Sequence, residues 1–187
     1  MEPDAAAPRP GVDQLRAVGR GLLAIPFPLS LLPVVLWGWL IWYLSAQSEV
    51  DPGPLVPRTP LIGNLAHAFE FGMLAFWAVL LLPRRGGWPA LSRTHVAGVA
   101  VLLLGYAFLD EWHQSRVPER NASLLDLLTD AVGIASVLVV IAYLGRSEAS
   151  SAGLRRRLLA GLAGCVAAAG LATFYQSRWG GGPWPFA

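Results

Sequence analysis

The chain has 187 residues, of which 55% are hydrophobic and only 14% are Asp, Glu, Lys or Arg. An average soluble domain is about 25% charged, so this chain has too few charged side chains to cover a water-exposed surface. Its mean hydropathy of +0.50 also excludes a disordered chain, which needs low hydrophobicity and a high net charge. We therefore expect a membrane protein.

Apolar runs of a length suited to the bilayer predict the fold. A spanning helix needs about 20 mainly apolar residues. Backbone groups in lipid must be hydrogen-bonded within the protein, which favours helices over isolated strands. We expect an all-α polytopic bundle of five transmembrane helices, at about 29–44, 65–82, 94–109, 127–144 and 158–175.

The basic residues predict the orientation of this bundle. All 14 are Arg, and they cluster in short segments between the apolar runs. Ten lie before the first span or in the second and fourth loops, and cytoplasmic loops carry an excess of basic residues. We expect the amino terminus inside, the carboxyl terminus outside and the first and third loops on the outer face. This clustering fits a lipid bilayer as the partner and not a nucleic acid.

The spans and their orientation divide the chain into five segments. We expect a flexible cytoplasmic tail at 1–28, a four-helix membrane domain at 29–145 and an Arg-rich cytoplasmic loop at 146–157. A fifth transmembrane helix at 158–175 and an extracytoplasmic tail at 176–187 complete the chain. The first span is expected to be retained as a signal anchor. Because Cys165 is the only cysteine, the chain forms no internal disulfide and no Cys-based zinc site.

Ionisable side chains enter three of the expected helices at their extracytoplasmic ends. Such groups cost about 2.5 to 3.5 kcal/mol at a helix centre and less near an end. By default they mark a function or a polar partner. We expect three helices to bring carboxylates and imidazoles to one depth beneath the outer membrane surface. The candidate ligand-binding set is His67, Glu70, Asp110, Glu111, His113, Gln114, Arg120, Asp126 and Asp130.

A structural interpretation explains these residues without chemistry. Ser123 and Asp126 have the spacing of a capping box at the start of the fourth helix. Asp110 and Glu111 end the third helix, where the helix dipole disfavours anions. A cation should therefore compensate them, and Arg116 and Arg120 in the next loop are the nearest. In this interpretation the polar residues only tie three helices together.

Two chemical interpretations remain beside the structural one. A divalent metal would take imidazole and carboxylate ligands, and the candidates are His67, Asp110, His113 and Asp130. Alternatively, His113 or His67 would act as a general acid or base with a carboxylate orienting it, and the catalytic candidates are His113 and Glu111. The chain carries no nucleophile elbow, Walker loop or dinucleotide fingerprint that would name a cofactor or nucleophile.

Three strings of residues resemble the VanZ-like family of bacterial membrane proteins over about residues 36–144. The first, Ser45-Ala46-Gln47, resembles the end of the family's first helix, and the second is the His67-Ala-Phe-Glu70 string. The most specific string resembles the family's Asp-Glu-x-x-Gln, Pro-Gly-Arg and Asp-x-x-x-Asn/Asp-x-x-Gly pattern. It comprises Asp110-Glu111-Trp112-His113-Gln114, Pro118-Glu119-Arg120, Asp126, Asp130 and Gly133.

The resemblance implies a multi-pass protein of the bacterial inner membrane. The family's namesake is associated with low-level resistance to the glycopeptide teicoplanin. This chain departs from the family at Gly63-Asn64, where an Asp-Lys pair often stands, and at Glu119, which replaces a Gly. We expect a non-enzymatic envelope protein whose outward polar site binds a lipid-linked or amphiphilic ligand. The alternative is a membrane-embedded, metal-dependent enzyme acting on a lipid-linked cell-wall intermediate.

Overall fold

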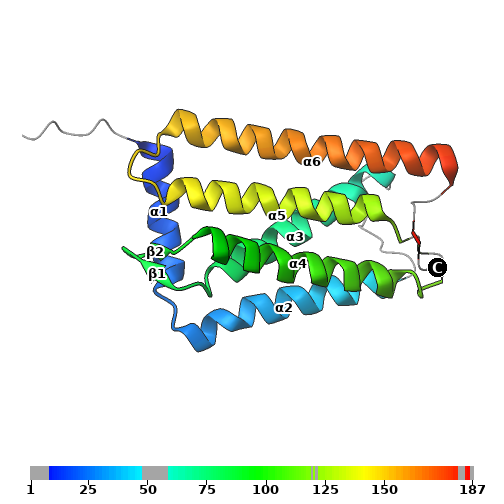
Figure 1. The fold of residues 1–187 in the computed structure, drawn as a ribbon, viewed down its shortest axis with the longest axis horizontal. Helices are drawn as coiled ribbons and strands as arrows, with labels where there is room; N and C mark the ends of the chain where they lie inside the picture. The colour runs from blue at the N-terminus through cyan, green and yellow to red at the C-terminus, as the bar shows by residue number, and fades with distance from the viewer. Residues whose placement is uncertain (1–8, 48–58, 119, 121, 181–183, 186–187) are drawn as a thin grey trace, which may run out of the picture.

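The protein is an all-α bundle with a short hairpin at one end (Figure 1). The computed structural model describes residues 9–47, 59–118, 120, 122–180 and 184–185. Five of the described helices are long and apolar enough to cross a membrane. They are α2 (Phe27–Ser45), α3 (Pro60–Val79), α4 (Arg93–Gln114), α5 (Leu124–Leu144) and α6 (Ser151–Trp179). This confirms the predicted all-α polytopic bundle.

Three of these helices extend at least five residues beyond the apolar runs that predicted them, and α3 begins at Pro60 instead of residue 65. Helix α4 continues to Gln114, five residues past the predicted end, and the polar side chains of Asp110, Glu111 and Gln114 in this extension are buried. Helix α6 begins at Ser151, seven residues before the predicted start, and includes three consecutive arginines. Long Arg side chains can place their charge at the membrane surface while their stems lie along apolar neighbours, so a helix can continue through them.

A sixth helix, α1 (Pro10–Leu23), lies within residues 1–28, which were predicted from the sequence to be a flexible tail. It crosses the ends of the spanning helices instead of running beside them (Figure 1). Arg9 donates to the carbonyl oxygen of Ser147 at 2.6 Å, and Arg16 donates to those of Leu144 (2.8 Å) and Arg146. The last carbonyls of a helix have no partner within it, and here α1 supplies donors to the end of α5.

The hairpin connects α1 with the same end of α5. It pairs β1 (Arg84–Arg85) with β2 (Trp88–Pro89) through Gly86 and Gly87, whose φ angles of 59° and 73° are those that a two-residue hairpin turn requires. The Trp88 indole donates to the carbonyl oxygen of Ile141 at 3.1 Å. A Cβ atom on Gly19 or on Gly145 would lie within 3 Å of this indole, so both glycines make room for it. We call this end of the bundle the α1 end.

The α1 end also carries most of the positive charge. The ten arginines expected on the cytoplasmic side lie in α1, in β1, at the starts of α4 and α6 and after α5, and all of these segments meet at this end (Figure 1). The geometry therefore agrees with one basic face, while its cytoplasmic location stays a prediction.

Helices α3 and α5 form the centre of the bundle, and the core lies between them and α4. Phe71, Ala75 and Ile134 are buried there, together with Leu103 of α4. The outward faces of α2 and α6 are apolar and exposed, as expected of surfaces that meet lipid chains. An apolar cavity of about 650 Å³ lies between α1, α3, α5 and α6, and the lone Cys165 lines it.

Candidate functional site

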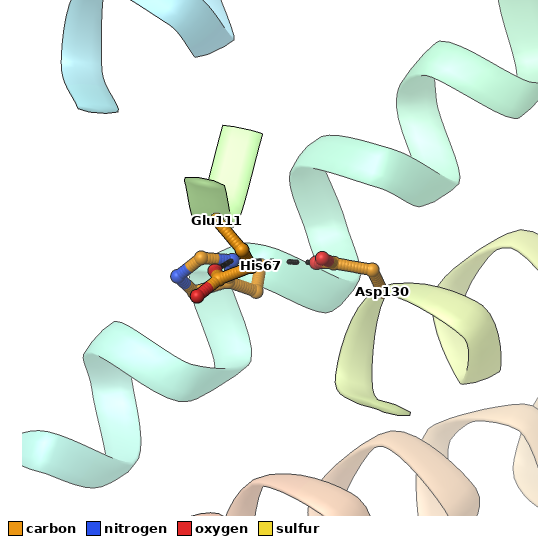
Figure 2. Close-up of side chains that lie close together, drawn as sticks. All are labelled: His67, Glu111 and Asp130. Atoms are coloured by element: carbon orange, nitrogen blue, oxygen red, sulfur yellow. Dashed lines mark ion pairs between the residues drawn. The ribbon is translucent and has the colours of Figure 1, made fainter. Parts of the chain in front are cut away.

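Three ionisable side chains from three helices meet inside the bundle. His67 of α3 lies between Asp130 of α5 and Glu111 of α4 (Figure 2). His67 Nδ1 is 3.3 Å from Asp130 Oδ1 and 3.9 Å from Glu111 Oε1, distances that make two ion pairs when the imidazole is protonated. We call these three residues the three-helix site. The sequence predicted their types and helices but not this choice of partners.

The three-helix site is buried and short of hydrogen bonds. Glu111 and Asp130 are both 0% exposed, and the His67 side chain is 14% exposed. Within the described chain, His67 Nδ1, Glu111 Oε1 and both Asp130 carboxylate oxygens have no hydrogen-bond partner. Leaving a buried polar group unsatisfied costs about 1–3 kcal/mol, and more when it is charged. Apart from the two ion pairs of His67, these four atoms are therefore free to accept or donate a further bond.

The second oxygen of Glu111 accepts a hydrogen bond that orients the carboxylate. Glu111 Oε2 accepts from the backbone N–H of Ser123 at 2.7 Å, directly before the start of α5. Ser123 caps α5 as the sequence predicted, its Oγ accepting from Leu125 N at 3.1 Å. The predicted reciprocal partner of the capping box, Asp126, is replaced by Glu111. The dipole of α4 disfavours the Glu111 carboxylate at the end of that helix, whereas the dipole of α5 favours a carboxylate at its N-terminus. The contact with Ser123 therefore offsets the unfavourable position of Glu111 in α4.

Asp110 belongs to a separate polar group between α2 and α4. Its two oxygens accept from Ser45 Oγ at 2.5 Å and from Gln114 Nε2 at 2.8 Å. All three side chains are buried. Ser45 is the functional contact that the candidate set left out, although the Ser45-Ala46-Gln47 string signalled it. Asp110 is therefore satisfied by protein donors, unlike the three-helix site.

His113 contacts α2 instead of the three-helix site. Its ring stacks on Trp42 with centroids 4.0 Å apart and planes 8° from parallel. Among the described residues, the side chains placed to share a metal ion are those of the three-helix site, whose ligand atoms lie within 4.8 Å of one another. This group includes neither His113 nor Asp110. Two of the four predicted metal ligands, His67 and Asp130, thus come together, and Glu111 takes the place of the other two.

The remaining candidate residues form no hydrogen bond or ion pair with the three-helix site in the described part of the chain. Arg116 is exposed, stacks on the Trp112 ring at 3.5 Å and donates to the Trp112 carbonyl, so it does not compensate Asp110 as expected. Arg120 Nε and Asp126 Oδ1 are buried without a hydrogen-bond partner in the described part of the chain. Glu70 lies in the middle of α3, where its carbonyl oxygen accepts from the Trp37 indole at 2.8 Å.

Gly133 explains how α5 comes close enough to α3 to bring Asp130 to His67. A Cβ atom on Gly133 would lie 2.1 Å from the carbonyl oxygen of Ala68, the residue after His67. Only a residue without a side chain fits there, and small residues let helix backbones approach closely in membranes. Asp130 lies one turn before Gly133 on the same face of α5, so this contact sets its distance from His67.

Together the fold and the site define a multi-pass membrane protein with a buried polar site shared by three helices. A family model described as VanZ/LLP1 matches residues 27–145, which span α2 to α5 and the whole three-helix site. The chain belongs to the VanZ/LLP1 family, as the sequence motifs predicted. No curated protein and no solved structure matched the chain in searches of each.

Proposed function

We propose that the protein acts in the envelope of bacteria, in the inner membrane, as a non-enzymatic binding protein. Its polar site would take the polar part of a lipid-linked or amphiphilic molecule, and its presence would reduce access of a lipophilic glycopeptide of the teicoplanin type. The observation that carries the proposal is the set of unpartnered buried atoms in the three-helix site and its neighbours Asp126 and Arg120.

The chemistry of these atoms limits the ligand. Carboxylate oxygens of Glu111 and Asp130 accept hydrogen bonds from hydroxyl or amine groups, and the Arg120 guanidinium donates to phosphate or carboxylate. A ligand offering both kinds of group satisfies both parts of the site. Apolar helix surfaces that surround the site suit a molecule whose remaining part is hydrocarbon.

Antibiotic tolerance of cells tests this proposal. We expect Arg120→Ala and Asp130→Asn to change tolerance to teicoplanin, while Arg116→Ala, in the same loop but exposed and outside the site, leaves it unchanged. Each variant is compared at equal membrane abundance, because loss of abundance in proportion to tolerance would support a structural knot instead.

Turnover by the purified protein separates binding from catalysis. The proposal expects none with lipid-linked cell-wall intermediates. Hydrolysis or group transfer that disappears in a His113→Ala or Glu111→Gln variant would contradict the proposal. That result would support the enzyme alternative, with these two residues in acid–base roles.

A further inference from the structure

We propose that the three-helix site binds one divalent transition-metal cation, through His67, Glu111 and Asp130. This inference rests on the same buried atoms as the proposed function and adds a cation to that site, where it would join three helices whether or not an amphiphile binds. It also replaces the set suggested by the sequence, which contained Asp110 and His113.

The positions of the donor atoms support the proposal. One imidazole nitrogen and one oxygen from each carboxylate lie within 4.8 Å of one another. Ligands of one ion bound at about 2.0–2.2 Å lie at most about 4.4 Å apart, so a small adjustment of side chains brings all three into range. Each residue comes from a different helix, and the site therefore needs the folded bundle (Figure 2).

The hydrogen-bonding state of the donors distinguishes this cluster from an ordinary group of acidic residues. The atoms that face one another, His67 Nδ1, Glu111 Oε1 and the Asp130 oxygens, form no hydrogen bond among the described residues and contact only one another, through the ion pairs of His67 Nδ1. Glu111 Oε2 points away and is fixed by the Ser123 N–H, as outer partners of metal ligands commonly fix a carboxylate. The neighbouring Asp110 has both oxygens satisfied and no such capacity.

Charge favours a divalent cation over a proton alone. When both are ionised, Glu111 and Asp130 place two negative charges at a fully buried position, and a single imidazolium offsets only one. A divalent ion offsets both while the imidazole binds in its neutral form. Carboxylate suits magnesium, calcium and manganese, whereas imidazole suits transition metals such as zinc. The imidazole of His67 therefore favours a transition metal over Mg²⁺ and Ca²⁺, and Zn²⁺ and Mn²⁺ are the ions to test.

Metal content of the intact purified protein tests the proposal. The full chain, in detergent and freed of metal with a chelator, is equilibrated with Zn²⁺ or Mn²⁺ and analysed by elemental mass spectrometry. We expect one ion per chain and a higher unfolding temperature with metal than without, because a ligand that binds only the folded state stabilises it.

Matched variants identify the ligands. Glu111→Gln and His67→Gln should each weaken binding by more than the roughly 10–100-fold typical of losing an outer partner. Asp110→Asn, a buried carboxylate one residue away, should keep one ion per chain. Size-exclusion profiles identify variants that remain folded, and only these are compared.

Two results would overturn the proposal. The first is a folded wild-type protein that takes up neither Zn²⁺ nor Mn²⁺ above a control membrane protein purified in parallel. The second is uptake that persists in His67→Gln and Glu111→Gln but is lost in Asp110→Asn, since the ion would then lie elsewhere. Neither result bears on teicoplanin tolerance, so the proposed function stands or falls separately.

Discussion

Gly133 of α5 packs against the backbone of Ala68 in α3, with no room for a Cβ atom between them. We expect Gly133→Ala to force the two helices apart. Overpacking of this kind costs about 1–3 kcal/mol, and here the obstacle is a backbone carbonyl that cannot rotate away. Thermal unfolding of the purified variant in detergent should show a lower midpoint than the wild type.

Gly105→Ala is the matched control for this prediction. Gly105 lies in α4, and a Cβ atom there meets nothing within 4 Å. Alanine is favoured over glycine in a helix by up to about 1 kcal/mol, so this variant should unfold at the wild-type midpoint or above it. Equal loss of stability in both variants would show that the contact with Ala68 is not responsible.

The buried group around Asp110 should depend on both of its donors. Gln114→Leu removes the donor to Asp110 Oδ2 and leaves a buried oxygen unsatisfied, at a cost of about 1–3 kcal/mol. Ser45→Ala should have a similar effect through Oδ1. Gln47→Leu is the control, because among the described residues the Gln47 amide makes only an exposed hydrogen bond to the Tyr43 carbonyl. Unfolding midpoints that do not separate Gln114→Leu from Gln47→Leu would contradict this assignment.

Docking of α1 should depend on Arg16 more than on Arg20. A hydrogen bond from a charged donor contributes about 1.5–3 kcal/mol, and each 1.4 kcal/mol is tenfold in an equilibrium. We therefore expect Arg16→Ala to speed amide hydrogen exchange in α1 by about tenfold or more. Arg20 makes no side-chain hydrogen bond or ion pair within the described residues, and Arg20→Ala should exchange like the wild type. Unchanged exchange in Arg16→Ala would show that α1 is held by apolar contacts alone.

Cysteine labelling tests the predicted orientation. In a Cys165→Ser background, Ser147→Cys places a thiol in the exposed loop at the α1 end, and Ser177→Cys places one near the opposite end of α6. With the basic face in the cytoplasm, a membrane-impermeant maleimide should label only Ser177→Cys in intact cells. It should label Ser147→Cys after permeabilisation. The reverse pattern would place the amino terminus outside.

The spanning helices could be predicted because composition alone marks them. Mainly apolar runs predicted all five, but this criterion stops where several polar residues follow one another. It therefore ended α4 at residue 109, although Asp110, Glu111 and Gln114 continue the helix through buried polar contacts. Helix α1 was missed because Arg9 and Arg16 bond to carbonyls more than 120 residues away, a contact that no local pattern reveals.

The partners within the candidate site could not be predicted. Spacing shows which residues share a face of one helix, for example Asp126 and Asp130, but not how far each helix is rotated or shifted against the next. That register depends on contacts such as Gly133 against Ala68. As a result, His67 was placed on the correct helix, while its proximity to Glu111 and not to His113 required the structure.

The polar contacts of α3 constrain the order in which the chain can be assembled. Helix α3 carries buried polar groups within its membrane span, and their polar partners are synthesised later: Glu111 and Asp130 for His67, and Thr173 and Gln176 for Asn64. When α3 leaves the ribosome, none of these partners exists. It must therefore be inserted, or held at the translocation machinery, with its polar groups still unmatched, and their pairing belongs to a later stage of biogenesis.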